Sequence, residues 1–264
     1  MAKANLYSSD GKKSGEVQLP SFFSESVNPV LIARAAISDQ THFYQPKSPD
    51  PLAGIKTSAK YRGRKDDFGS LKNHGQAMLP REVLANGRAG RVRRIPSSVK
   101  GRRAHPPKIE KKLIEKVNKK EYLKALHSAM AATAISDFVS KRGHKVPSDI
   151  SLPIVLDEKA ELISKSKDAL KMLLAIGIGA DLARGQKAKK RSGVGSRKGG
   201  KRRPKSLLVI VENMKSPIAK AARNLPGVDV RTACCVSVID LAPGTVAGRL
   251  TAYTKSALVA LEKR

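Results

Sequence analysis

The second half of the chain alternates between short apolar runs and segments in which apolar residues recur every three to four positions. Leu207–Val211 is apolar throughout, which is typical of a strand buried on both faces. Shorter strands are predicted at Leu152–Leu156, Val228–Arg231 and Leu250–Tyr253. Because helical segments separate these strands, the pattern favours a mostly parallel sheet with helices on both faces.

The clearest helix is predicted to start after Asn118. Asn118 and Glu121 form a capping-box pattern, and the helix can run to about Lys141 before Gly143 ends it. Its apolar residues have helical spacing: Leu123, Leu126, Met130, Ala134 and Phe138. Further helices are predicted at Ile109–Val117, Ser166–Ile176, Ala180–Arg184, Ser216–Asn224 and Thr254–Glu262. Val238–Leu241 fits either a short helix or a short strand.

The first forty residues predict a hairpin and a helix. Ala4–Tyr7 and Glu16–Leu19 are two short strand candidates around a turn at Ser9-Asp10-Gly11. Asn28-Pro29 then starts a helix that fades near Gln40. Its apolar side is expected to contain Val30, Leu31, Ala35 and Ile37. The predicted fold class is α/β: a three-layer body with a mostly parallel sheet covered by helices, plus a long basic extended loop.

Residues 45–107 have a different composition from the rest of the chain. They contain 15 basic residues against four acidic ones, and Leu, Ile, Val and Phe occupy only 10 of the 63 positions. So few apolar side chains cannot offset the entropy of ordering a charged segment. We therefore expect residues 1–44 and 108–264 to form a single α/β globular domain, with residues 45–107 inserted as a long basic extension. As a hairpin of roughly 30 residues a side, it could reach about 100 Å.

A second basic segment, residues 184–205, contains 11 Lys and Arg residues and no acid. Its five glycines favour flexibility, so a second basic, glycine-rich loop is predicted. The two segments together carry +22 of the formal net charge of +30. Because such cations repel one another, we expect both segments to bind a polyanion and to release its condensed counterions.

Two glycine-rich motifs resemble catalytic ones without completing them. Gly195–Arg202 follows the P-loop pattern until its last position, where Arg202 replaces the Ser or Thr that would hold magnesium. Gly177-Ile178-Gly179 is half of a dinucleotide fingerprint, but it follows a helix, and Leu182 takes the third glycine position. We therefore expect no enzymatic activity and no cofactor.

The five histidines and two cysteines show no metal-binding pattern. His127 lies on the predicted long helix and is interpreted as structural. His74 and His105 lie in the first basic segment, where they could stack on bases or contact phosphates. Cys234 and Cys235 lie in the apolar run ACCVSVI and are interpreted as small buried hydrophobic residues.

Nucleic acid is the expected partner, and a large folded RNA fits best. The chain has no Trp and only five Tyr and five Phe, so an aromatic stacking platform is not expected. Nor does the pattern contain a helix-turn-helix or a basic region joined to heptads. Long cationic arms that order on binding suit the phosphate channels of a folded RNA. Two alternatives stay open: an RNA-modifying α/β enzyme such as a methyltransferase, and a histone-like DNA-binding protein.

The candidate RNA-binding residues are the cations and histidines of the two basic segments. In the first segment they are Lys60, Arg62, Arg64, Lys65, Lys72, His74, Arg81, Arg88, Arg91, Arg93, Arg94, Lys100, Arg102, Arg103 and His105. In the second they are Lys187, Lys189, Lys190, Arg191, Arg197, Lys198, Lys201, Arg202, Arg203 and Lys205. Their expected role is to neutralise phosphates.

The sequence predicts a protein without membrane contact. It contains no run of about 18 apolar residues, the length that a bilayer requires. The first thirteen residues have no apolar region after Lys3 that would form a secretory signal. We therefore expect the protein to be cytoplasmic.

Several motifs resemble a known family. Asn118–Ala134, closing with Arg142-Gly143-His144, is similar to the signature of the universal large-subunit ribosomal protein four family, in its archaeal and eukaryotic branch. Gly75–Arg81 and Gly101–Pro107 resemble the same branch, and the resemblance covers essentially the whole chain. It implies an α/β body bound to ribosomal RNA on the outer surface of the large ribosomal subunit. It also implies a long loop that helps form the narrow part of the nascent-peptide exit tunnel.

The same resemblance implies partners and a tunnel-facing segment. The partners are large-subunit ribosomal RNA and neighbouring large-subunit ribosomal proteins, and no homo-oligomer is expected. The residues expected to face the tunnel are His74, Gly75, Gln76, Met78 and Arg81.

Overall fold

The computed structural model describes residues 3–263. The chain divides into two compact units, Met1–Phe43 with Ile114–Arg264, and Tyr44–Leu113. We call the first unit the body and the second the extension, and we describe each by itself.

A six-stranded sheet forms the centre of the body. Its strand order is β2-β1-β5-β10-β8-β9, and only the β1–β2 pair is antiparallel. The strands are β1 (Lys3–Tyr7), β2 (Lys13–Gln18), β5 (Ile154–Leu156), β8 (Leu208–Val211), β9 (Asp229–Thr232) and β10 (Thr251–Thr254). This confirms the predicted α/β class and the mostly parallel sheet.

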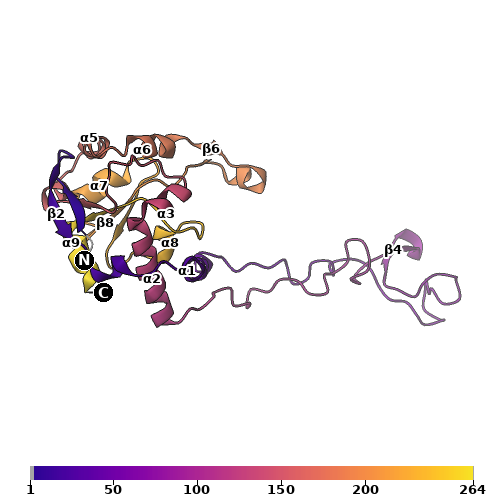
Figure 1. Ribbon diagram of the computed structural model, residues 1–264. Helices are drawn as coiled ribbons and strands as arrows, with labels where there is room; N and C mark the ends of the chain where they lie inside the picture. The colour runs from indigo at the N-terminus through magenta and orange to yellow at the C-terminus, as the bar shows by residue number, and fades with distance from the viewer. Residues whose placement is uncertain (1–2, 264) are drawn as a thin grey trace. The chain divides into compact units, whose positions relative to one another are not determined.

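Helices cover both faces of this sheet (Figure 1). One face packs against α1 (Pro29–Thr41), α2 (Lys119–Ala134), α8 (Val238–Leu241), α9 (Lys255–Glu262) and the 3₁₀ helix η1 (Ser21–Ser24). The other face packs against α4 (Glu158–Glu161), α5 (Ser166–Ile176), α6 (Gly179–Gln186) and α7 (Pro217–Arg223). Strand residues alternate between the two cores, as Leu208 and Ile210 lie in the first and Val209 and Val211 in the second. The three layers follow from this alternation.

The predicted long helix after Asn118 is two helices. It breaks at Ile135, whose backbone is extended (φ −98°, ψ 116°), and α3 (Ser136–Lys141) follows. Leu126 of α2 packs in the first core, whereas Val139 of α3 packs in the second. One straight helix could not reach both cores, so tertiary packing overrides the helical pattern.

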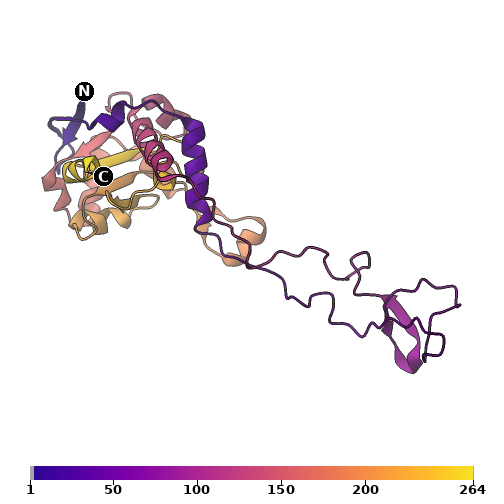
Figure 2. The same ribbon diagram turned by 90° about the horizontal axis from the view of Figure 1, so that it is seen from below.

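The apolar side assigned to α1 is partly wrong. Val30 and Ile37 are 79% and 41% exposed, and the helix instead buries Ile32, Ala35 and Ala36. Its start is as predicted, because the Asn28 side chain accepts a hydrogen bond from the Leu31 N–H. Figures 1 and 2 both show α1 lying beside α2, and this neighbour decides which side of α1 is buried.

The helix predicted at Ile109–Val117 is absent, and residues 109–117 have no regular structure. Ile109 and Ile114 are 60% and 52% exposed, so the apolar positions have no core to face. A helix of nine residues without tertiary packing does not offset its nucleation cost.

The two cysteines are exposed, which corrects their interpretation as buried residues. They follow β9 in a turn where the Cys235 N–H donates to the Thr232 carbonyl. Ala233 and Val236 on either side are buried. The apolar run thus crosses a turn, in which Ala233, Val236 and Val238 reach the core and the two cysteines do not.

The extension contains a small antiparallel hairpin of β3 (Arg81–Val83) and β4 (Ala89–Val92), with the 3₁₀ helix η2 (Ala85–Gly87) between them. An isolated bridge pairs Lys60 with Arg81. Ala59 and Leu71 are buried within this unit. The extension therefore has a small packed part of its own.

In the body, residues 184–205 form a basic ribbon rather than coil. β6 (Lys189–Lys190) pairs antiparallel with β7 (Lys201–Arg202), and the 3₁₀ helix η3 (Gly193–Lys198) lies between them. We call residues 184–205 the ribbon. The incomplete P-loop motif falls on η3 and β7, where no helix starts after it. Gly177 is the left-handed C-cap of α5 (φ 102°), which explains the other glycine motif as a helix end.

Across the described residues 3–263, no helix is both long enough and apolar enough to cross a bilayer.

Candidate nucleic-acid interface

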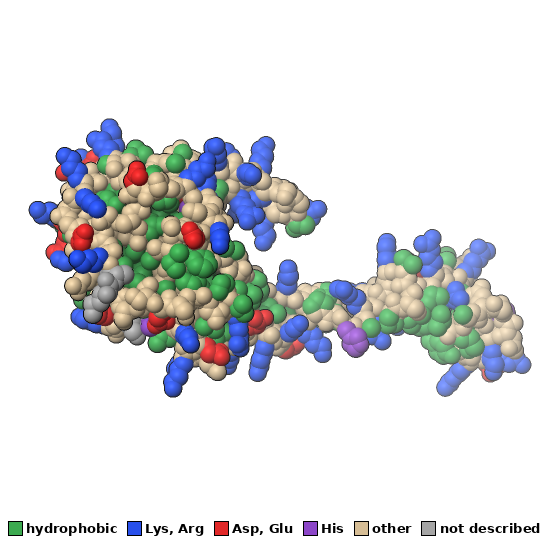
Figure 3. Space-filling model, in the orientation of Figure 1, with side chains coloured by type: hydrophobic (Ala, Val, Ile, Leu, Met, Phe, Trp, Pro, Cys, Tyr) green, Lys and Arg blue, Asp and Glu red, His purple; other side chains and the backbone are tan. Residues whose placement is uncertain are grey.

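The cations of the extension lie mostly on its surface. Twelve of its fifteen candidate residues are exposed, and three are half-buried: Arg62, Arg81 and Arg93. Figure 3 shows Lys and Arg side chains projecting along the extension, with few acidic ones between them. Exposed cations in an irregular backbone can each contact a phosphate and release its condensed counterions.

Several arginines of the extension also hold its own structure. Arg93, the residue after β4, places its Nε 2.7 Å from Glu82 Oε1 of β3, and a second nitrogen of Arg93 donates to the Val99 carbonyl. Arg62 Nη1 donates to the Phe68 carbonyl at 2.9 Å. These groups cross-link the turns of the extension, so their contact with RNA would use only their outward N–H groups.

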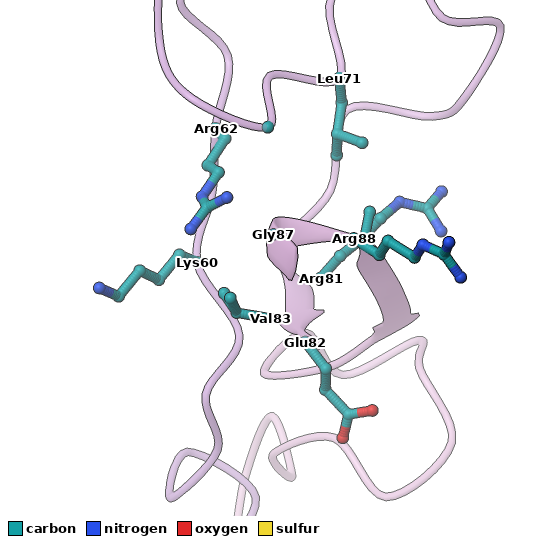
Figure 4. Close-up of a pocket in the computed structure, with 10 residues that line it drawn as sticks. Lys60, Arg62, Leu71, Arg81, Glu82, Val83, Gly87 and Arg88 are labelled. Carbon is teal, nitrogen blue, oxygen red and sulfur yellow. The ribbon is translucent and has the colours of Figure 1, made fainter. Parts of the chain in front are cut away.

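The packed part of the extension has little empty space. Lys60 and Arg62 lie on an irregular segment of the extension beside the β3–β4 hairpin (Figure 4). With Arg81 and Arg88 they line a hollow of about 10 Å³. That volume holds about one water molecule and no phosphate group. Phosphates would therefore contact the outside of this unit.

The segment predicted to face a tunnel is exposed. His74, Gly75, Gln76 and Met78 lie in irregular backbone before β3, with Met78 40% exposed. Arg81 differs, because it is half-buried and donates to the Ala77 carbonyl at 3.3 Å. These positions form one continuous surface segment.

The ribbon places like charges directly opposite one another. Lys189 pairs with Arg202, and Lys190 pairs with Lys201. Because neighbouring strand residues point to opposite faces, both faces of the ribbon are basic. Like charges opposite each other weaken strand pairing. A polyanion would remove this repulsion, and all ten candidate residues of the ribbon are exposed to one.

The ribbon is attached to the body through a buried acid, Asp181 of α6. The Asp181 carboxylate is fully buried and accepts hydrogen bonds from Arg184 Nε (2.8 Å), Ser206 Oγ (2.6 Å) and the Lys145 N–H (3.2 Å). His144 Nδ1 lies 3.1 Å from the same carboxylate. Burial acts to raise the pKa of Asp181, but the hydrogen bonds from His144, Arg184 and Ser206 outweigh it and hold the pKa well below its usual range.

His144 is buried, and its Nδ1 lies 3.1 Å from an Nη atom of Arg184 as well as from Asp181. Burial lowers the pKa of its imidazole, against the opposing effect of Asp181, so the ring is held neutral. Among the described residues, its Nε2 is buried without a hydrogen-bond partner. His127 is structural as predicted, since it stacks on Phe22 and hydrogen-bonds to Glu25.

A second buried charge, Arg249, lies beside the end of the ribbon. It is 1% exposed, and its Nε donates to the Ser206 carbonyl at 3.1 Å. It also donates to Asp229, which accepts hydrogen bonds from Lys205 Nζ at 2.8 and 2.9 Å. Lys205 is therefore the one ribbon candidate that the body already pairs with an acid among the described residues.

Sequence reasoning missed Asp181 and Arg249, and His144 entered only as part of a family motif. The signal for Asp181 was local, because an acid three residues before Arg184 on a helix can pair with it. No local signal marked Arg249, which donates to the Asp240 carbonyl and to the carbonyl of the more distant Ser206.

Comparison with known proteins decides the family. The family model described as "Ribosomal protein L4/L1 family" matches residues 17–264. The chain belongs to this family. The match spans the extension and the ribbon, so both basic regions are part of the L4/L1 family pattern.

Relatives within the L4/L1 family cover nearly the full chain. A protein from Methanocaldococcus jannaschii named "Large ribosomal subunit protein uL4" is 46% identical over 264 residues, 99% of each chain. Proteins of the same name from Methanococcus vannielii and Haloquadratum walsbyi are 44% and 42% identical, over 98% and 97% of each chain. The predicted family resemblance is confirmed.

Proposed function

We propose that this chain is a structural, non-catalytic protein of the large ribosomal subunit that binds ribosomal RNA. Membership of the L4/L1 family and the names of its relatives support this function. The structure adds two cationic regions, the extension and the ribbon, on one α/β body. The body anchors these regions, and they make the phosphate contacts.

The like-charge pairing of the ribbon carries this proposal. Four cations face one another across two short strands, and no acid of the ribbon screens them. Such an arrangement is unfavourable by itself and becomes favourable when phosphates neutralise it and release their counterions. A surface that only contacts water would gain nothing from placing these like charges opposite one another.

The extension has a second role in this proposal. Its segment from His74 to Arg81 helps form the wall of the nascent-peptide exit tunnel, and its other cations hold ribosomal RNA. Support comes from the family resemblance and from the exposure of His74, Gly75, Gln76 and Met78. Neighbouring large-subunit ribosomal proteins are the other partners, and the protein acts in the cytoplasm.

The structure disfavours the enzymatic alternative. A methyltransferase of the doubly wound kind needs a glycine-rich loop that leads from the first strand into a helix. Here β1 turns into the antiparallel strand β2. The DNA-binding alternative is left to experiment.

A salt titration tests RNA binding. The affinity of the full chain for a large-subunit ribosomal RNA fragment is measured at several salt concentrations, for the wild type and for a variant with Lys189, Lys190, Lys201 and Arg202 changed to Ser. The slope of log affinity against log salt should become shallower by about 3. The matched control changes four exposed body lysines, Lys13, Lys159, Lys167 and Lys220, to Ser and should leave the slope nearly unchanged.

Two further measurements define failure of this proposal. The chain should stay with large subunits during sedimentation in high salt, whereas a casual polyanion binder would be washed off. Equal affinity for duplex DNA and for the RNA fragment would favour the DNA-binding alternative. If the ribbon variant and the body control lose the same RNA affinity and salt dependence, the ribbon is not part of the RNA-binding surface.

A further inference from the structure

We infer that Asp181 is a positioning residue for RNA binding: it sets the direction in which the ribbon leaves the body, without touching RNA itself. This inference rests on the proposed function of the ribbon. Its basis is that the buried Asp181 carboxylate contacts residues at both ends of the ribbon, and that the ribbon has few internal contacts to fix its direction.

The first step is the contact of Asp181 with both limbs of the ribbon. On the outgoing limb, Arg184 donates to both carboxylate oxygens of Asp181, at 2.8 and 3.3 Å. Directly after the returning limb, Ser206 Oγ donates to the same carboxylate at 2.6 Å. Arg184 also donates to the Lys205 carbonyl at 2.7 Å, which closes the loop between the limbs. Both limbs are thus fixed by one group.

Close backbone packing reinforces this connection. A Cβ added at Gly185 would lie 2.7 Å from the Pro226 carbonyl oxygen. Gly227 has φ +85°, and a Cβ there would lie 2.9 Å from the Pro204 carbonyl oxygen. Only glycine lets the two limbs approach residues 226–227 this closely. The start and the end of the ribbon therefore share one packed site.

The ribbon has little structure with which to orient itself. Its strands are two residues each, and their paired side chains repel. Gly185 is its one buried residue, so no side chain of the ribbon is buried among the described residues. The attachment at its ends must therefore set its direction. An arm held in its bound direction loses less entropy on binding than one that searches for it.

A double-mutant cycle tests this role. Asp181→Asn is introduced into the wild type and into the four-serine ribbon variant, and affinity for the ribosomal RNA fragment is measured in both. The expected result is a loss of about fivefold in the wild-type background and little change in the ribbon variant. A merely structural role would lower affinity equally in both backgrounds.

The matched control is Asp168→Asn, which removes the same charge from an exposed residue of α5. Because losing an acid raises the net charge, this control should bind RNA slightly more tightly. The loss expected for Asp181→Asn therefore runs against its electrostatic effect. Tighter binding by both variants would overturn the inference.

A second variant covers the case in which Asp181→Asn does not fold. Arg184→Gln keeps the buried acid but removes the donor to the Lys205 carbonyl, and it should show the same coupling to the ribbon cations. Amide hydrogen exchange of residues 187–203 should become faster while β8 and β10 stay protected. Unchanged exchange together with unchanged affinity would also overturn the inference. If the four-serine ribbon variant binds the ribosomal RNA fragment as tightly as the wild type does, the proposed RNA-binding role of the ribbon is wrong, whatever Asp181→Asn shows.

Discussion

The extension and the ribbon are both basic, but they are held in different ways. In the extension, some cations also bond internally, as the Arg93–Glu82 pair and the Arg62–Phe68 contact show. In the ribbon, the outward cations face one another, and the holding contacts lie at its attachment to the body. The extension is long and is cross-linked by contacts among its own residues, whereas the short ribbon is held by contacts with buried residues of the body.

The largest expected effect concerns the attachment of the ribbon. Arg249→Met should lower the free energy of unfolding of the body by about 3–5 kcal/mol, because it leaves the carbonyl groups of Ser206, Leu207 and Asp240 without this donor and leaves Asp229 with Lys205 as its one cation among the described residues. Arg223→Met, an exposed arginine of α7, should change it by less than about 0.5 kcal/mol. Chemical denaturation measures both. Similar values would show that Arg249 does not stabilise this site.

Acid should weaken the same attachment in a defined window. His144 has a lowered pKa in the folded chain, so the unfolded chain binds its proton first as the pH falls below about 6.5. Stability is fully present above that pH and should fall below it, by at most about 1.4 kcal/mol per pH unit for this one group. Asp181 adds a further loss only below about pH 4, since its pKa is also lowered.

Denaturation at pH 5 to 7 tests the histidine part of this prediction. His144→Asn retains a donor near Asp181 and should make stability less dependent on pH in this range. His74→Asn, an exposed residue of the extension, should keep the wild-type dependence. An equal slope in all three proteins would contradict the prediction.

The extension should respond to loss of its internal ion pair without affecting the body. Arg93→Gln removes a half-buried partner of Glu82 and should destabilise the β3–β4 hairpin locally by about 1 kcal/mol. Limited proteolysis should then cut residues 81–99 faster, while the unfolding midpoint of the body stays the same. Arg91→Gln, an exposed neighbour on β4, is the control and should be cut like wild type. A shift of the body midpoint would show that the two units unfold together.

The smallest expected effect concerns pairing within the ribbon. Lys190→Glu turns the repulsive pair with Lys201 into an attractive one and should slow amide exchange in β6 and β7 by about two- to fivefold. The same change should weaken RNA binding. Lys190→Ser, which only removes repulsion, should give a smaller change in both measurements. Faster exchange in the glutamate variant would show that like-charge repulsion does not control this pairing.

Sequence patterns were sufficient for the elements that depend on local chemistry. The apolar run at Leu207–Val211 predicts β8, and Thr254 caps α9 as its side chain accepts the Ala257 N–H. The composition of residues 45–107 and 184–205 identified the two basic regions before any fold was known. These features can be predicted from the sequence because each depends only on residues close in sequence or on composition.

Only the tertiary structure decided the break at Ile135, the exposure of Cys234 and Cys235, and the missing helix at residues 109–117. It also brought His144 and Ser206 to Asp181, and Ser206 to Arg249, from segments far apart in the chain. Burial and long-range hydrogen bonds depend on which surfaces meet after folding. The sequence by itself therefore determined that this protein carries two cationic regions on an α/β body, and the fold determined how the ribbon is held.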